Sequence, residues 1–153
     1  CIADISPDRI IIHQGTNELK DKNNLAENIT KNIIDHAESL KSKVSEVFIS
    51  SLVIRNDHLN KKRQEVNEIL KKKCKENNTP YIDNDNITSA MLTSKGLHLN
   101  DNGTVRLVNN FCNSVSKWLK NTKLTREKYD KENSELMNDT DSSRNSLYTM
   151  KML

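Results

Sequence analysis

The sequence feature that most constrains the fold is an apolar run, Ile10-Ile11-Ile12, that ends abruptly in the polar segment His13-Gln14-Gly15-Thr16-Asn17-Glu18. Three consecutive isoleucines favour a strand that is covered on both faces, which is typical of parallel sheets. Gly15 and Asn17 are turn-forming residues at the carboxyl end of that strand. Because open α/β sheets bind ligands at this edge, the segment predicts a buried strand that delivers a polar loop to a binding edge.

The remainder of the chain alternates between strand and helix patterns. Strands are predicted over residues 8–13, 44–54 and 81–83, where β-branched and apolar residues cluster. Amphipathic helices are predicted after each strand, with apolar stripes that run from Leu25 to Leu40, from Leu59 to Cys74, and, beyond a cap near Thr104, over Val108, Phe111, Cys112, Val115 and Leu119. This order predicts an α/β fold with a parallel sheet and helices on both faces.

Composition limits how much of the chain can fold. Only 34% of the 153 residues are hydrophobic and 29% are charged, so the apolar residues must be concentrated in a few segments. Residues 122–153 are rich in Lys, Asn, Ser, Asp and Glu, and we predict a mostly disordered tail there, with a short helix over 126–137. The folded domain is therefore expected over residues 1–121. Three strands make a thin sheet, and the start at Cys1 suggests that further strands belong upstream, which leaves the domain incomplete at its N-terminus.

The charge and the cysteines exclude several classes of function. A net charge of +3 with interleaved signs does not by itself indicate nucleic-acid binding, and the triplets Lys61-Lys62-Arg63 and Lys71-Lys72-Lys73 are predicted to be solvated helix faces. Cys1, Cys74 and Cys112 lack the spacing of a disulfide framework or a zinc site. Together with the absence of a signal peptide or membrane span from the sequence, they predict an intracellular, cytoplasmic protein with no membrane partner.

No metal or cofactor site is predicted. His13, His36 and His58 are scattered, with no metal-ligand spacing. The chain has only three glycines, and none belongs to a phosphate-binding loop.

Two polar loops at the predicted binding edge resemble conserved blocks of the SGNH (GDSL-like) ester hydrolase family. Gly15-Thr16-Asn17-Glu18 resembles the Gly-x-Asn-Asp block, and Gly96-Leu97-His98-Leu99-Asn100 resembles the block that carries the catalytic His. The resemblance covers roughly residues 3–120 and implies a three-layer, flavodoxin-like α/β/α fold. More narrowly, the segments are similar to esterase-type domains in open reading frames of some non-LTR retrotransposons.

The resemblance implies roles that suit these residue types. Asn17 would donate its side-chain amide to the oxyanion of a tetrahedral intermediate, and His98 would be the general base. Gly15, Thr16, Glu18, Gly96 and Asn100 would support the two loops. The substrate implied is a small ester or acyl compound. Without the resemblance, Asn17 is simply a turn residue and His98 a loop residue.

Three departures from the family pattern bear on activity. The nucleophilic Ser and the second-block Gly of the family are expected upstream of Cys1, and no serine of this chain can be assigned the nucleophile's role. Lys95 stands three residues before His98, where the family has its triad acid, and a cation there would oppose the imidazolium that forms in catalysis. Glu18 replaces the usual Asp. Asp83, Asp85 or Asp101 could replace the acid, or a Ser-His dyad could suffice.

Three hypotheses follow from the sequence. The first is that the chain is the carboxyl-terminal part of an SGNH-type esterase domain and is inactive by itself. The second is that the fold is a non-catalytic binding or assembly module for RNA or protein in a mobile-element protein. Lys95 and the basic triplets are the residues that favour it. The third is a decayed reading frame without function.

Overall fold

The computed structural model describes the backbone of residues 7–149 and the side chains of residues 7–125 and 127. The chain divides into two compact units, Cys1–Ser114 and Val115–Leu153. Cys1 lies outside the described residues, as do residues 150–153 of the predicted tail.

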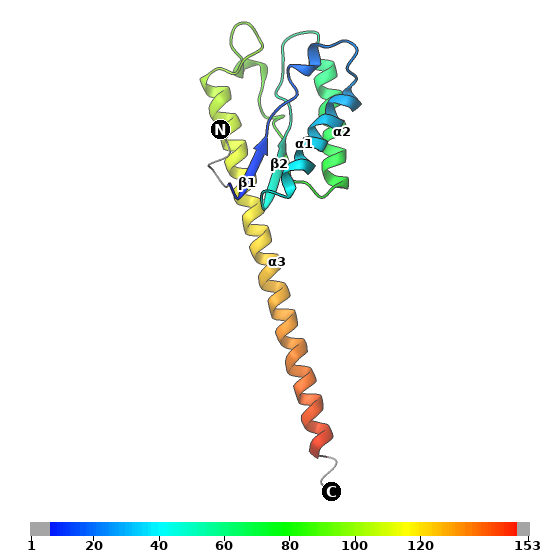
Figure 1. The fold of residues 1–153 in the computed structure, drawn as a ribbon. Helices are drawn as coiled ribbons and strands as arrows, with labels where there is room; N and C mark the ends of the chain where they lie inside the picture. Colours follow the sequence, from blue (N-terminus) through cyan, green and yellow to red (C-terminus); the bar gives the residue numbers. More distant parts are fainter. Residues whose placement is uncertain (1–6, 150–153) are drawn as a thin grey trace. The chain divides into compact units, whose positions relative to one another are not determined.

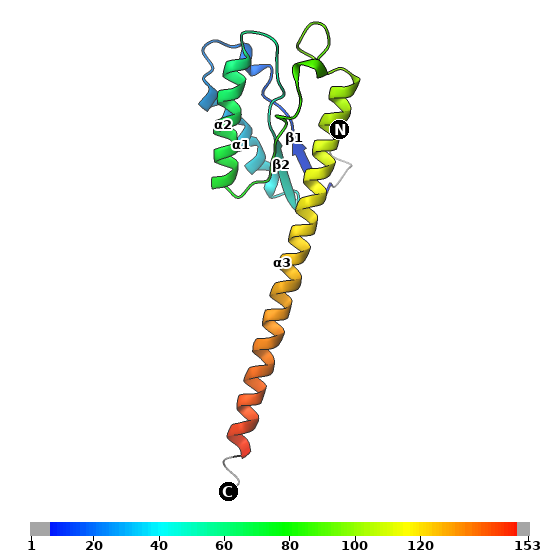
Figure 2. The same ribbon diagram turned by 180° about the vertical axis from the view of Figure 1, so that it is seen from behind.

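The first unit is built on a parallel sheet of three strands, β1 (Arg9–Ile12), β2 (Glu46–Ser50) and β3 (Tyr81–Ile82), in the order β1-β2-β3. Ile11 pairs with Phe48, and Ser50 pairs with Ile82. Helices α1 (Ala26–Lys41) and α2 (Asn60–Glu76) cover one face, and residues 101–114 of α3 (Asp101–Thr149) lie on the other (Figures 1 and 2). The predicted α/β class, with a parallel sheet and helices on both faces, is confirmed.

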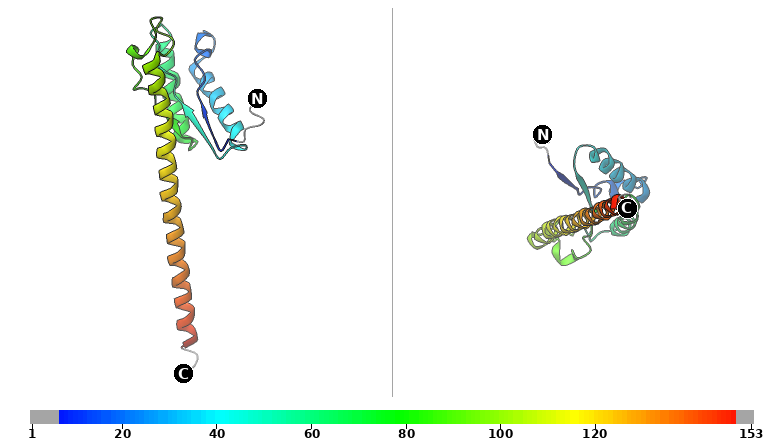
Figure 3. Two further views of the ribbon diagram at one scale, coloured as in Figure 1. Left: turned by 90° about the vertical axis from the view of Figure 1, so that its left-hand side faces the viewer. Right: turned by 90° about the horizontal axis from the view of Figure 1, so that it is seen from below.

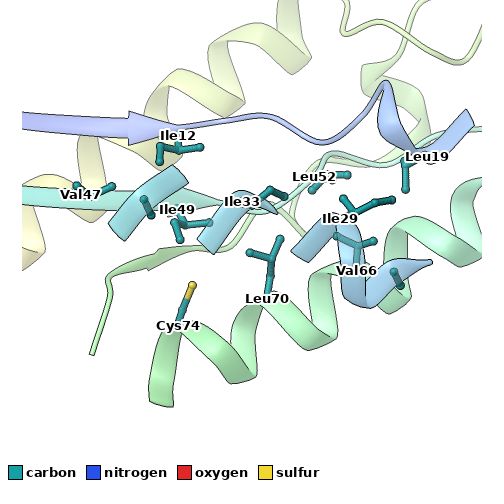
Figure 4. Close-up of a cluster of buried hydrophobic side chains, with 12 residues drawn as sticks. Ile12, Leu19, Ile29, Ile33, Val47, Ile49, Leu52, Val66, Leu70 and Cys74 are labelled. Atoms are coloured by element: carbon teal, nitrogen blue, oxygen red, sulfur yellow. The ribbon is translucent and has the colours of Figure 1, made fainter. Parts of the chain in front are cut away.

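The core lies between the sheet and helices α1 and α2. Figure 4 shows side chains from both helices and from alternate strand positions meeting there, among them Ile12, Ile33, Val47, Ile49, Val66 and Leu70. Each fully buried residue of this kind contributes about 1.5–3 kcal/mol relative to an exposed one. Cys74 belongs to the cluster, as the sequence predicts, and burial raises the pKa of its thiol to about 11. It is therefore an inert packing residue.

Strand β2 ends earlier than predicted because a side chain takes over its backbone hydrogen bonds. The sequence predicts a strand over 44–54, but regular pairing stops at Ser50. At Leu52 the backbone N–H donates to the Asn67 Oδ1 atom at 2.8 Å, and the Asn67 Nδ2 atom donates to the Leu52 carbonyl at 2.9 Å. The backbone N–H and carbonyl of Leu52 thus have hydrogen-bond partners in a buried segment without a neighbouring strand.

The prediction that Lys61-Lys62-Arg63 is a solvated face is wrong for Arg63, which is only 6% exposed. Its NH1 atom lies 3.4 Å from the Leu52 carbonyl, and burial lowers the pKa of this guanidinium. A run of basic residues on a helix does not show which side chain faces the core. Here it is Arg63, whose planar guanidinium carries several hydrogen-bond donors.

The last helix differs from its prediction in two respects. Its side-chain cap is Asn100, whose Oδ1 atom accepts from the Gly103 N–H at 3.0 Å, whereas Thr104 donates its hydroxyl back to the Asn100 carbonyl. Its apolar stripe is not buried as predicted: Val108 is 50% exposed, Leu119 is 39% exposed, and Cys112 is also exposed. Among the described residues the sheet has no strand beyond β1, so no further strand covers Val108 or Cys112.

Helix α3 continues through Thr149 as one uninterrupted helix (Figure 3), so residues 122–149 are helical where the sequence predicts mostly disorder. The segment after Gly103 contains neither glycine nor proline, so nothing in it interrupts a helix. Thr122 and Thr125 donate to carbonyls four residues earlier, and Lys123 pairs with Glu127. The helix predicted over 126–137 lies within α3, and the domain boundary at residue 121 stays a prediction.

Among the helices of the described residues, none combines the length and apolar content that crossing a bilayer requires.

Candidate active site

The loop that follows β1 presents Asn17 on a constrained backbone. Gly15 has φ +111°, and a Cβ atom there would lie 3.0 Å from the Ile33 Cδ1 atom, so this buried turn requires glycine. Leu19, only 1% exposed, anchors the far side of the loop in the core. Asn17 begins the 3₁₀ turn η2 (Glu18–Lys20) but makes no side-chain capping bond. Its exposed amide is therefore available to a ligand.

The second loop carries His98 and is closed by backbone contacts. It is closed by a backbone bond from the Thr93 N–H to the His98 carbonyl, at 2.7 Å, and by a bridge between Leu92 and Leu99. His98 is exposed, and over the described side chains its imidazole makes no hydrogen bond. The loop thus fixes the backbone of His98 and leaves the ring open to solvent.

The His98 loop docks on the segment after β2 through Gly96 and Asn56. The Asn56 N–H donates to the Gly96 carbonyl at 2.9 Å. Gly96 has φ +66°, and a Cβ atom there would lie 2.6 Å from the Asn56 Cβ atom. Only glycine allows this approach. In Figure 1 the Asn17 loop and the His98 loop stand at the carboxyl end of the sheet, on either side of this segment.

Asn100 ties the end of the His98 loop to its surroundings. Besides capping α3, it donates from Nδ2 to the carbonyls of Ala90 and Leu92, at 3.0 and 3.2 Å. Its backbone N–H donates to the Met91 carbonyl. These bonds join the short turn η3 (Ser89–Met91) to the first turn of α3.

The candidate acids for His98 differ in what already engages them. Burial acts to raise the pKa of Asp83, but hydrogen bonds from the Asp85 N–H and from Lys71 outweigh it and lower that pKa. Asp85 lies 3.9 Å from the Arg63 NH1 atom. Asp101, in the first turn of α3, has no ion pair among the described residues. Lys95, at the position of the family's acid, is exposed.

A polar network that the sequence did not predict crosses the sheet beside these loops. The His13 Nδ1 atom lies 2.9 Å from the Ser50 Oγ atom, and the Asn84 Nδ2 atom donates to the same oxygen at 2.8 Å. Asn110 of α3 donates in turn to the Asn84 Oδ1 atom at 3.0 Å. The only sequence signal was that His13, Ser50 and Asn84 stand near the ends of three adjacent strands.

The segment after β2 also holds a buried cation. Arg55 is 3% exposed and donates to Asp57 through Nε, at 3.0 Å, and through NH2. The hydrogen bond from Arg55 lowers the pKa of Asp57, whose Oδ1 atom also accepts from the Leu59 N–H at the start of α2. The sequence predicts Asn56 or Asp57 as the cap of this helix, but the N-cap position is Leu59, which has no side-chain capping bond, and Asp57 instead accepts from the N–H of Leu59 itself.

Neither a family model nor a curated protein matches the sequence. Solved structures do match. A GDSL-like lipase from Bacteroides thetaiotaomicron has a TM-score of 0.64 at 20% identity, covering 76% of this chain and 67% of that chain. The fold is that of GDSL-like hydrolases.

Two further structures support this fold. A catalytic Ser→Ala mutant of an acetylxylan esterase from Geobacillus stearothermophilus has a TM-score of 0.61 at 14% identity, covering 72% of this chain and 60% of that chain. A member of the lipolytic G-D-S-L family from Veillonella parvula has a TM-score of 0.57 at 23% identity, covering 67% of this chain and 60% of that chain. The chain thus spans between three fifths and two thirds of the length of these proteins.

Proposed function

We propose that this chain is part of an SGNH-type ester hydrolase, in which Asn17 donates to the oxyanion and His98 is the general base. The observation that carries the proposal is that the loops carrying these two residues both lie at the carboxyl end of a sheet with a GDSL-like fold (Figure 1). The Asn17 amide makes no capping bond and the His98 ring is exposed to solvent. An oxyanion donor and a general base both need such accessible groups.

The reaction proceeds in two steps. His98 takes the proton from a serine hydroxyl as its oxygen attacks the acyl carbonyl, and Asn17 donates an N–H to the oxygen that becomes negative. His98 then gives the proton to the leaving alcohol. Water, activated by the same imidazole, releases the acid and restores the serine. Asp101 would orient the imidazole, or the serine and His98 would act as a dyad.

The serine nucleophile is proposed to come from a segment upstream of Cys1 that adds strands to the free edge of β1. Ile10 and Ile11 remain half-buried in β1, although the isoleucine run is typical of an interior strand. Val105 and Val108 of α3, 59% and 50% exposed, leave an apolar surface uncovered. Within this chain, Ser50 and Ser51 are buried, which disfavours them as nucleophiles.

The test is activity with and without such a segment. The chain alone should neither hydrolyse a short acyl ester nor react with a fluorophosphonate serine probe. A chain extended by the Gly-Asp-Ser strand segment of a GDSL-like lipase should do both. Labelling of any serine within this chain would contradict the assignment of the nucleophile, and a folded but inactive extended chain would contradict the proposed hydrolase.

The second candidate function is a non-catalytic module that binds RNA or protein, and Lys95 favours it. The structure of the basic triplets weakens this alternative for RNA, because Lys71 and Lys73 pair with Asp83 and Glu76 and Arg63 is buried. A folded, inactive extended chain whose RNA affinity falls steeply with salt would favour the module.

A further inference from the structure

A cavity of about 410 Å³ lies between the segment after Asn17 and the start of α2. This volume is within the range of roughly 300–1,000 Å³ that small-molecule sites occupy. The lining side chains belong to two stretches of the chain, residues 19–26 and residues 58–65.

The charge of this cavity is strongly positive. Lys20, Lys22, Lys61 and Lys62 line it, whereas Glu65 is the one carboxylate among the lining residues. The Lys62 Nζ atom donates to the carbonyls of Leu19 and Asp21, at 3.2 and 2.7 Å, which holds this ammonium group across the two stretches. None of the four lysines has an ion pair among the described residues. An anionic group would therefore find ammonium donors with no competing carboxylate on them.

The apolar part of the lining is aliphatic. Leu25 is 61% exposed and occupies the N-cap position of α1, where leucine is disfavoured because it cannot cap. Leu59 holds the same position in α2, again without a side-chain cap. Two leucines placed at helix starts therefore border the lysines, and no Phe, Tyr or Trp lines the cavity. This surface suits an alkyl chain better than a nucleobase, which would use aromatic stacking.

We propose that this cavity binds a single-chain anionic amphiphile, with its carboxylate or phosphate among the lysines and its alkyl chain against Leu25 and Leu59. The cavity and its lysines carry the proposal, which does not rest on ester hydrolysis. A free fatty-acid carboxylate and an alkyl phosphate share this chemistry, and the experiment separates them from each other and from a lipid surface.

The test is calorimetric titration of the full chain with decanoate and with decyl phosphate, each as monomers. At least one of the two ligands should bind with a stoichiometry of one molecule per chain. Its affinity should fall as the salt concentration rises from about 20 mM to about 500 mM. Inorganic phosphate and the neutral decyl maltoside should each bind at least roughly tenfold more weakly, since each lacks half of the contacts.

Variants locate the site. Lys20→Gln with Lys61→Gln should weaken binding roughly five- to tenfold. Leu25→Ser, at an exposed position, should weaken it roughly three- to tenfold without unfolding the chain. The matched control is Lys72→Gln with Lys75→Gln, which removes the same charge from α2 outside the cavity and should leave affinity within about twofold.

Three outcomes would overturn the proposal. They are no saturable binding of either monomer, an equal loss in the control variant, and binding only to anionic phosphatidylglycerol vesicles. The second would indicate general charge attraction, and the third a surface for membranes.

Discussion

The imidazole Nδ1 atom of His13 lies 2.9 Å from the hydroxyl oxygen of Ser50, and this contact joins the ends of β1 and β2. Asn84, after β3, donates to the same oxygen, and the His13 ring packs edge-on against Phe111 of α3 at a centroid distance of 5.9 Å. The network therefore links all three strand ends to the helix that follows the His98 loop. It holds together the edge at which the proposed chemistry takes place.

Replacing Ser50 with Ala should lower the free energy of unfolding by roughly 1–3 kcal/mol, because the buried Asn84 amide loses one of its two acceptors, keeping only the Ser51 carbonyl, and His13 loses its partner. Urea denaturation measures the change. Ser45→Ala, at an exposed position, is the matched control and should change stability by less than about 0.5 kcal/mol. Equal effects of the two substitutions would show that the network contributes nothing.

Stability should also depend on the protonation of His13. Burial against Ser50 and Phe111 lowers the pKa of His13 below its ordinary 6.5, although part of the residue is exposed. As pH falls below about 6.5, the unfolded chain takes up this proton before the folded one does, so the free energy of unfolding falls until the folded pKa is passed.

Urea denaturation at several pH values between 7.5 and 5 checks this in the wild type and in His13→Gln. The stability difference between the two proteins should shift against the wild type as pH falls, and the shift cancels contributions that both share, such as the raised pKa of Glu46. A difference that does not change with pH would mean that the ring titrates normally.

Replacing Gly96 with Ala should displace the His98 loop and cost roughly 1–3 kcal/mol, since the position has φ +66° and the new Cβ would meet Asn56. Adding Asn56→Gly removes the collision but not the backbone strain, so the double variant should recover part of the loss. Ser94→Ala in the same loop is the control. Hydrogen exchange of the Asn56 amide reports whether the loop has moved, and full protection in Gly96→Ala would contradict the prediction.

The fold was predictable where hydrophobic pattern decides structure. Ile10-Ile11-Ile12 predicted β1, and the apolar spacing of α1 and α2 predicted helices whose ends lie within a few residues of those observed. The sequence could not predict where β2 stops, because that depends on Asn67, a polar residue on a helix that follows the strand. Polar partners far apart in sequence leave no periodic signal.

In the candidate site, the glycine positions could be predicted from the sequence, but the burial of individual side chains could not. Gly15 and Gly96 were predicted as supports of their loops, and both occupy positions that other residues would strain. The burial of Arg63 and the uncovered stripe of α3 were not predictable, because both depend on which surfaces the rest of the fold provides. The roles of Asn17 and His98 stay predictions.

The most direct test of the account is the rate of fluorophosphonate labelling of the chain extended by a Gly-Asp-Ser strand segment. His98→Ala and Asn17→Ala should each slow labelling of the new serine by roughly a hundredfold or more, because the serine loses its base or its oxyanion donor. Lys72→Ala, at an exposed position of α2, should label at the unchanged rate. Labelling that is equally fast without the His98 imidazole would contradict the proposed active site.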